Sequence, residues 1–203
     1  LSPCMNTIYT IGHSNHTTEK FTELLQQHHI TAIADVRSTP WSRFHTQFNQ
    51  EEIKSTLKDQ QIYYVYLGEE LGARRNEREA YQRGNIQFER IPQLPLFQKG
   101  IERLQTGSSS LNIALLCAEA NPLECHRAIL ITRHLQQDHP IQHICKDGST
   151  INQQQLEEEL LSTHKLGIDL FNGPDQLPAM VENAYQLQAK QIAYQEESHD
   201  EQN

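Results

Sequence analysis

The chain has 203 residues, a formal net charge of −9 and a hydrophobic content of 36%. This length is typical of one domain with an appendage. No apolar run of about 18 residues is present, and no basic patch precedes an apolar stretch at the start, so the sequence predicts neither a transmembrane helix nor a secretory signal. The negative charge argues against unspecific binding to polyanions. Residues 1–4 precede Met5 and are interpreted as a leader or a cloning remnant.

Apolar runs typical of strands alternate with patterns typical of helices along the first 165 residues. In chain order, the predicted elements are a strand at 6–12, a helix at 17–30, a strand at 31–38, a helix at 48–60, a strand at 61–68, a helix at 95–106, a strand at 111–119, a helix at 121–139, a strand at 141–148 and a helix at 151–165. Continuous apolar strands separated by helices indicate a parallel sheet. We therefore expect an α/β fold with a mainly parallel, five-stranded sheet and helices on both faces, a Rossmann-like sandwich.

Two segments depart from this alternation. Residues 69–94 are charged, irregular and long for a connection, which is typical of a functional loop or lid. Between residues 152 and 203, ten acids oppose two lysines. We interpret residues 1–167 as the α/β domain and residues 168–203 as an acidic C-terminal extension. The pattern predicts that this extension is helical around 181–194 and disordered at its end.

The chain contains four cysteines, at positions 4, 117, 125 and 145. They form no paired C-x-x-C spacing, and no sign of export accompanies them. The sequence therefore predicts reduced thiols in a cytoplasmic protein.

Polar and charged side chains follow four of the predicted strands. In an open α/β sheet, ligands bind beyond the carboxyl ends of the strands. At this edge we expect His13, Asp35 and Glu119 to transfer protons and Cys117 to act as a nucleophile. The predicted substrate-binding residues are Ser14, Arg37, Asn49, Arg74, Arg75, His126 and Arg127.

The stretch LLCAEANPLECHRAIL at 115–130 is the densest of these segments. Asn121 as a cap, with Glu124 three residues later, predicts a helix that begins at Pro122. On such a helix Cys125 would pack against the sheet as an inert side chain. Adjacent Cys125 and His126 would point about 100° apart, and C-x7-C-H is not a usual zinc spacing. We therefore predict no metal site.

Structural alternatives accompany the functional interpretations. Asp35 and Arg37 alternate along a strand end and point the same way, so they suit an ion pair as well as catalysis. The arginines of 69–94 are offset by glutamates and suit a solvated, self-paired loop. A hydrogen-bonded structural role suits His13. Each of these alternatives stays open from the sequence.

Four motifs in order, TIGHSN, ADVRSTPWSRF, LGEELGARR and LLCAEANPLECHR, resemble the bacterial and archaeal family called domain of unknown function 488. The resemblance covers residues 7–150 and implies a compact α/β domain with a parallel sheet, without implying a reaction. Ala73 stands where the family often has a second glycine. The motif residues are Gly12, His13, Ser14, Asp35, Val36, Arg37, Phe48, Asn49, Leu71, Gly72, Arg74, Arg75, Cys117, Glu119, Pro122, Cys125, His126 and Arg127.

These observations predict an enzyme, a hydrolase or transferase, acting on an anionic substrate that bears phosphate, such as a nucleotide or nucleic acid. A second hypothesis is a nucleotide or nucleic-acid binding module without catalysis, in which Trp41, Phe44 and Phe48 stack on bases. A third is thiol or sulfur-transfer chemistry at Cys117. The expected partner is an anionic small molecule or nucleic acid and not a membrane. The sequence leaves the cofactor and the oligomeric state open.

Overall fold

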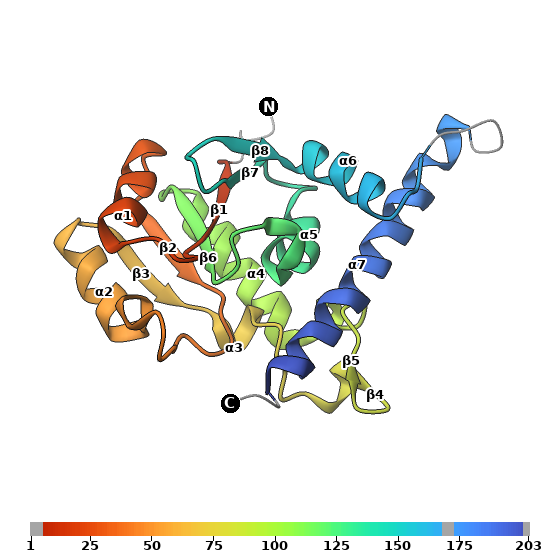
Figure 1. Ribbon diagram of the computed structural model, residues 1–203, viewed down its shortest axis with the longest axis horizontal. Coiled ribbons are helices and arrows are strands. Elements are labelled where there is room, and N and C mark those ends of the chain that lie inside the picture. The colour runs from red at the N-terminus through yellow and green to blue at the C-terminus, as the bar shows by residue number, and fades with distance from the viewer. Residues whose placement is uncertain (1–5, 168–172, 201–203) are drawn as a thin grey trace.

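The computed structural model describes residues 6–167 and 173–200. Its centre is a six-stranded sheet in the order β3-β2-β6-β1-β7-β8 (Figure 1). The first five of these strands run parallel, and β8 is antiparallel to β7. The strands are β1 (Ile8–Gly12), β2 (Ala32–Asp35), β3 (Tyr63–Tyr66), β6 (Ile113–Cys117), β7 (Ile141–Ile144) and β8 (Thr150–Asn152).

The α/β class and the mostly parallel sheet agree with the sequence, but the strand count of five does not. All five predicted strands are present, and β8 is the addition. The sequence pattern assigned Ile151 and Asn152 of this strand to the start of a helix. Asn152 explains the confusion, since it ends β8 and also caps helix α6 (Gln153–Thr163) through a capping box with Gln155.

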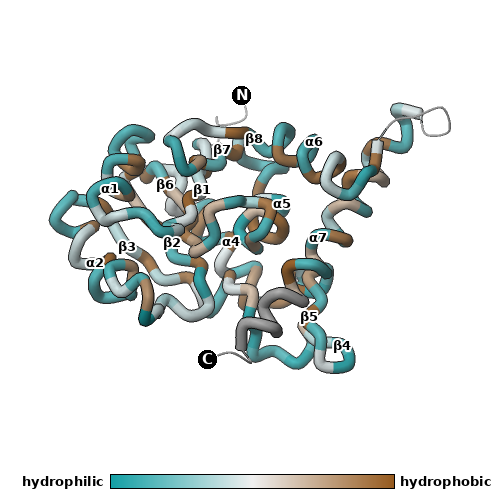
Figure 2. Tube along the Cα trace, viewed as in Figure 1, coloured by the Kyte–Doolittle hydropathy of each residue, from teal (hydrophilic) through white to brown (hydrophobic). Residues whose placement is uncertain are grey.

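Helices cover both faces of the sheet. Since successive strand residues point to opposite faces, neighbouring residues of one strand pack against different helices. Leu116 packs in the cluster formed with α1 (Thr18–Gln27) and α2 (Gln50–Asp59). Its neighbour Leu115 packs in the larger cluster with α4 (Pro95–Ser108), α5 (Arg133–Leu135) and α6. Figure 2 shows hydrophobic and hydrophilic residues alternating along these helices.

The segment that the sequence marked as a loop or lid contains short regular elements. Ala80, Phe88 and Ile91 are buried there, so the segment is packed against the domain. Its small hairpin turns at Arg83 and Gly84, both with positive φ. The elements are α3 (Gly68–Leu71), η2 (Arg78–Ala80), β4 (Tyr81–Gln82), β5 (Asn85–Ile86) and η3 (Ile91–Gln93).

The C-terminal extension contains η6 (Pro174–Gln176) and the long helix α7 (Leu177–Asp200). α7 lies against α6 (Figure 1), and its Ala184, Tyr185 and Ile192 belong to the larger core cluster. The helix includes residues 196–200, for which the sequence predicted disorder. The predicted boundary at residue 168 and the last residues, 201–203, lie outside the described part of the chain.

The predicted continuous helix at 121–139 is wrong. A 3₁₀ turn, η4 (Pro122–Glu124), ends at Cys125, whose backbone is extended with φ −136° and ψ 138°. The π-helical η5 (Arg127–Thr132) then leads into α5. Asn121 does cap this turn, accepting a hydrogen bond from the Leu123 backbone N–H. Elsewhere, Thr17 caps α1 and accepts a hydrogen bond from the Lys20 backbone N–H.

No helix in 6–167 or 173–200 combines the length and apolarity needed to cross a bilayer.

Candidate functional site

The candidate site lies at the end of β6, which sits between β1 and β2 in the sheet. Cys117 pairs in register with Gly12 of β1, and Leu116 pairs with Asp35 of β2. Pairing continues past the strand ends, where the His13 N–H donates to the Cys117 carbonyl at 2.9 Å. The three chain segments that carry most of the predicted site residues therefore meet at one edge.

Gly12 allows the loop after β6 to lie directly on β1. A Cβ atom at Gly12 would be 1.7 Å from the Glu119 carbonyl oxygen. Any other residue would push this loop outward, because such a contact is far below van der Waals distance. The glycine thus fixes the position of Glu119 relative to the sheet.

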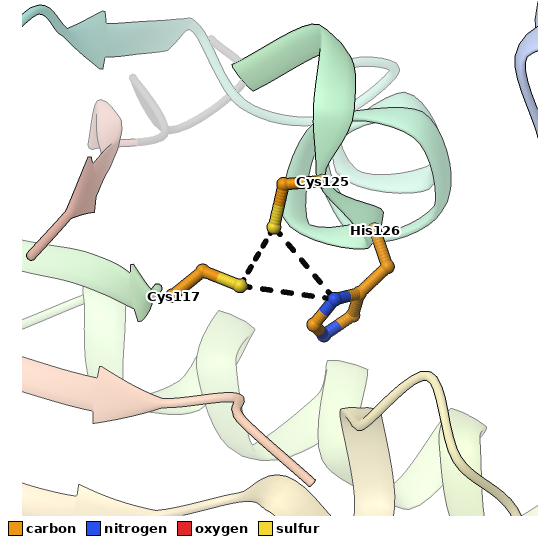
Figure 3. Close-up of side chains that lie close together, drawn as sticks. All are labelled: Cys117, Cys125 and His126. Carbon is orange, nitrogen blue, oxygen red and sulfur yellow. Dashed lines mark hydrogen bonds between the residues drawn. The ribbon is translucent and has the colours of Figure 1, made fainter. Parts of the chain in front are cut away.

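Cys117, Cys125 and His126 form a buried cluster at this edge (Figure 3). The two Sγ atoms are 2.6 Å apart, and the His126 Nδ1 atom lies 3.8 Å from the Cys117 Sγ and 3.7 Å from the Cys125 Sγ. The His126 Nε2 atom is 3.0 Å from the Val36 carbonyl oxygen. Since a carbonyl only accepts hydrogen bonds, Nε2 carries the proton and Nδ1 presents a lone pair to the sulfurs.

The cluster exists because Cys125 is not helical. The sequence argument against a shared ligand assumed that Cys125 and His126 sit on one helix, pointing about 100° apart. With Cys125 extended and His126 at the start of the next helical segment, both side chains point to the same place. The sequence also predicted that Cys125 packs as an inert side chain. It is indeed buried, but against the Cys117 sulfur.

Glu119 lies beside this cluster. The Cys117 thiol donates a hydrogen bond to the Glu119 Oε2 atom at 2.9 Å. Burial alone would raise the pKa of Glu119, but hydrogen bonds from the thiols bring that pKa below its ordinary value. Burial and the adjacent Cys125 raise the pKa of the Cys117 thiol well above its ordinary value. Without another positive charge, Cys117 is therefore a protonated and weak nucleophile at neutral pH.

Arg127 holds the loop that contains Glu119 in place. It is fully buried, and its guanidinium donates to the carbonyl oxygens of Glu119 at 2.8 Å and Ala120 at 3.2 Å. Its Nε–H donates to the Thr10 hydroxyl at 3.3 Å. These contacts make Arg127 a clamp on the protein backbone, whereas the sequence predicted a substrate-binding role.

Asp35 and Arg37 form a buried bidentate ion pair, the structural alternative that the sequence left open. The Arg37 Nη2 atom is 2.6 Å from Asp35 Oδ2, and its Nε atom is 2.9 Å from Oδ1. The Tyr64 hydroxyl also donates to Oδ2 at 2.8 Å, and burial together with the Asp35 charge raises the pKa of Tyr64. The remaining Arg37 Nη1 atom donates to the Phe48 carbonyl. Because their hydrogen-bonding groups are occupied by protein partners, Asp35 and Arg37 suit a positioning role.

The two arginines of the LGARR motif differ in their surroundings. Arg75 is buried, and its guanidinium donates to the Glu70 carbonyl and to the Glu77 carboxylate. Arg74 is exposed, and its backbone N–H donates to the Ser38 hydroxyl.

Arg74 shares one cleft, with a volume of about 190 Å³, with Cys117 and His126 of the buried cluster. A neighbouring cavity of about 580 Å³ shares Ser38, Thr39 and Arg74 with it. Neither Ser38 nor Thr39 was among the predicted site residues, although both follow Arg37 directly. The cleft is lined by Arg37, Ser38, Thr39, Ala73, Arg74, Cys117, Ala118, Glu119 and His126.

The other predicted residues lie around this centre. The His13 ring stacks on Phe48 with centroids 4.6 Å apart, and burial lowers its pKa to about 4, so it is neutral at pH 7. Ser14 has a positive φ, and its backbone carbonyl contacts the His13 ring at 2.9 Å. The Asn49 side chain accepts a hydrogen bond from the Ser42 backbone at 2.6 Å, which anchors the preceding loop. None of these three lines the cleft.

Comparison with known proteins gives one match. The family model described as Domain of unknown function DUF488 matches residues 17–134. This range contains the cleft residues and excludes His13, Ser14 and the C-terminal extension. No curated protein and no solved structure matches the chain.

Proposed function

The chain belongs to the family described as domain of unknown function 488, whose model matches more than half of it, and we propose that it is an enzyme acting on an anionic, phosphate-bearing substrate in the cleft beside Cys117. The single observation that carries this proposal is the cleft that Arg74 shares with Glu119, Cys117 and His126. A hydrolase or transferase needs such a combination of an anion-binding cation and reactive groups.

The surroundings of each side chain indicate its role in the proposed reaction. Arg74 is exposed and lines the cleft, and it is the cation that we assign to the substrate anion. Glu119 projects into the cleft from a loop that Gly12 and Arg127 hold in place, and it is the group positioned for proton transfer.

The test is a hydrolysis assay with p-nitrophenyl phosphate and bis(p-nitrophenyl) phosphate, run on the full chain and on Arg74→Gln. We expect the variant to raise KM about 10- to 100-fold, since a charge-assisted hydrogen bond contributes about 1.5–3 kcal/mol. Arg78→Gln is the matched control, because Arg78 is an exposed arginine of the same segment outside the cleft. Absence of turnover on both esters, or equal kinetics for the two variants, would reject the proposal.

A second candidate function is nucleotide or nucleic-acid binding without catalysis. Its support is an aromatic loop in which Trp41 is 66% and Phe44 is 73% exposed. The Arg43 guanidinium lies 4.6 Å from the centroid of the Phe44 ring. Such surfaces stack on unpaired bases at about 1–3 kcal/mol per base. Filter binding of single-stranded DNA at low salt tests it, with Trp41→Ala and Phe44→Ala expected to abolish retention. Binding that survives both substitutions would exclude this loop.

We further infer a cytoplasmic location, because Cys117, Cys125 and Cys145 are free thiols and such thiols are typical of reducing compartments. The placement of the cleft beyond the carboxyl ends of parallel strands is typical of Rossmann-like sheets and supports that relationship.

A further inference from the structure

We propose that Cys117, Cys125 and His126 bind a zinc ion whose fourth coordination position opens into the cleft. The proposal does not depend on the substrate class inferred above. Three side chains of the types that zinc prefers present their ligand atoms within 4.8 Å of one another, and all three are buried.

The distances fit a tetrahedral ion with one adjustment. With Zn–S of about 2.3 Å and Zn–N of about 2.0–2.1 Å, tetrahedral geometry separates sulfur from nitrogen by about 3.5 Å and the two sulfurs by about 3.7 Å. The two S–N separations, 3.8 and 3.7 Å, already have this size (Figure 3). The sulfurs, at 2.6 Å, must part by about 1 Å. Cys125 is the side chain free to do so, since it belongs to a loop and not to the sheet.

Neighbouring groups orient the ligands as they do around bound zinc. The His126 Nε2–H donates to the Val36 carbonyl, which fixes the ring with Nδ1 toward the sulfurs. The Arg127 backbone N–H donates to the Cys125 Sγ at 3.5 Å, a contact that stabilises a thiolate.

The charges around the cluster are compatible with bound zinc. Arg127 is fully buried, and within the described residues its guanidinium donates to neutral oxygens. A buried cation needs a negative charge close by. Zn²⁺ with two thiolates is neutral, as two protonated thiols are, so the adjacent Glu119 carboxylate balances Arg127 with or without the ion. Binding of the ion therefore leaves the local charge balance intact.

The open fourth position gives the ion a place in catalysis. Cys117, Glu119 and His126 line the cleft, so a water molecule on the ion would face solvent beside the Glu119 carboxylate. Three protein ligands with one open position are typical of catalytic zinc, which lowers the pKa of bound water. Glu119 is then the acceptor for the proton of that water, a role it plays without being a ligand.

The experiment measures metal binding by the full chain. The reduced protein is stripped with a chelator, supplied with Zn²⁺, desalted and analysed for zinc by mass spectrometry, with the affinity taken from competition with a chromophoric chelator. We expect one zinc ion per chain and a dissociation constant of about 0.1 µM or tighter. Co²⁺ in place of Zn²⁺ should produce the thiolate-to-cobalt charge-transfer absorption in the near ultraviolet.

Variants identify the ligands. Cys125→Ser and His126→Gln should each weaken zinc binding by about 100-fold or more. Cys145→Ser is the matched control, because Cys145 is the third free cysteine and lies outside the cluster. Glu119→Gln should retain zinc. Wild-type protein that retains no zinc, or a control variant that loses it equally, would overturn the proposal.

A second measurement avoids the risk that a ligand variant fails to fold. Iodoacetamide labelling of the wild-type protein is followed by peptide mass spectrometry, with and without zinc. Zinc should protect Cys117 and Cys125 but leave the labelling of Cys145 unchanged. Equal labelling in both states refutes the site, and so does a Cys117–Cys125 disulfide that forms with zinc present, which would instead support thiol chemistry. Zinc binding without phosphoester turnover would reject the proposed function alone, and turnover without zinc would reject the zinc site alone.

Discussion

His143 should make the folded protein less stable as the pH falls below 6.5. Its ring lies in β7 and is fully buried. The Nε2–H donates to the Gln153 side-chain oxygen at 3.0 Å, and Nδ1 accepts from the Thr10 hydroxyl at 2.9 Å. Both ring nitrogens therefore have partners that suit a neutral imidazole. Burial and, to a lesser extent, the nearby Arg127 charge lower the pKa of His143 to about 3.

The direction and size of this stability change follow from proton linkage. The folded-state pKa lies below the unfolded value of about 6.5, so the unfolded chain takes up the proton first as the pH falls. The stability is fully present above pH 6.5 and is lost progressively toward pH 3. Between pH 7 and pH 5 the loss from this histidine is about 2 kcal/mol, since each pH unit below the unfolded pKa costs about 1.4 kcal/mol.

Urea unfolding followed by circular dichroism at pH 7, 6 and 5 measures this loss in the wild type and in His143→Gln. Glutamine keeps a donor and an acceptor but does not titrate. The variant should be less stable at pH 7 and should lose about 2 kcal/mol less than the wild type on going to pH 5. His13, with a pKa of about 4, contributes equally to both proteins and cancels. Parallel pH curves for the two proteins would refute the reasoning.

Three further substitutions probe local contacts by urea unfolding. Thr17→Ala removes the cap that accepts the Lys20 N–H and should cost about 1 kcal/mol; an unchanged midpoint would show that the cap is not needed. Tyr185→Phe removes the hydroxyl that binds Gln153 and Glu157, and should cost about 1–3 kcal/mol because a buried amide loses its partner; a neutral result would mean that α7 is not held by this contact. Gly12→Ala forces the Glu119 carbonyl away and should cost about 1–3 kcal/mol or more, together with at least a tenfold loss of zinc affinity. Wild-type zinc binding in this last variant would contradict the account of the loop.

The strand pattern shows which part of the fold follows from local sequence. Five apolar runs predicted five strands, and all five form. Four of them, β1, β2, β6 and β7, are mostly buried and need continuous apolar residues whatever their neighbours are, whereas the edge strand β3 leaves alternate residues exposed. The order of the strands, by contrast, does not follow from local sequence, because it depends on the crossovers that place β6 between β1 and β2. That order brings Cys117 beside Gly12 and Asp35, and no local pattern contains it.

The stretch LLCAEANPLECHR shows where local reasoning fails. Asn121, Pro122 and Glu124 are good helix-start residues, and a helix does begin there as a single 3₁₀ turn. It stops at Cys125 because the chain is tied elsewhere, through Arg127 to the Glu119 and Ala120 carbonyls and through His126 to Val36. These contacts lie between residues far apart in the sequence or across the loop itself, so capping rules do not include them.

The sequence by itself determined the α/β class, the family and the residues that gather at one sheet edge, because periodicity and motif order are local properties of the chain. Only the tertiary structure decided what those residues do to one another. It placed the guanidinium groups of Arg37, Arg75 and Arg127 on protein oxygens, since buried guanidinium groups must have partners. It also brought Cys117, at the end of β6, together with Cys125 and His126, which the sequence had placed about 100° apart on one helix, because the break at Cys125 directs both side chains toward the Cys117 sulfur.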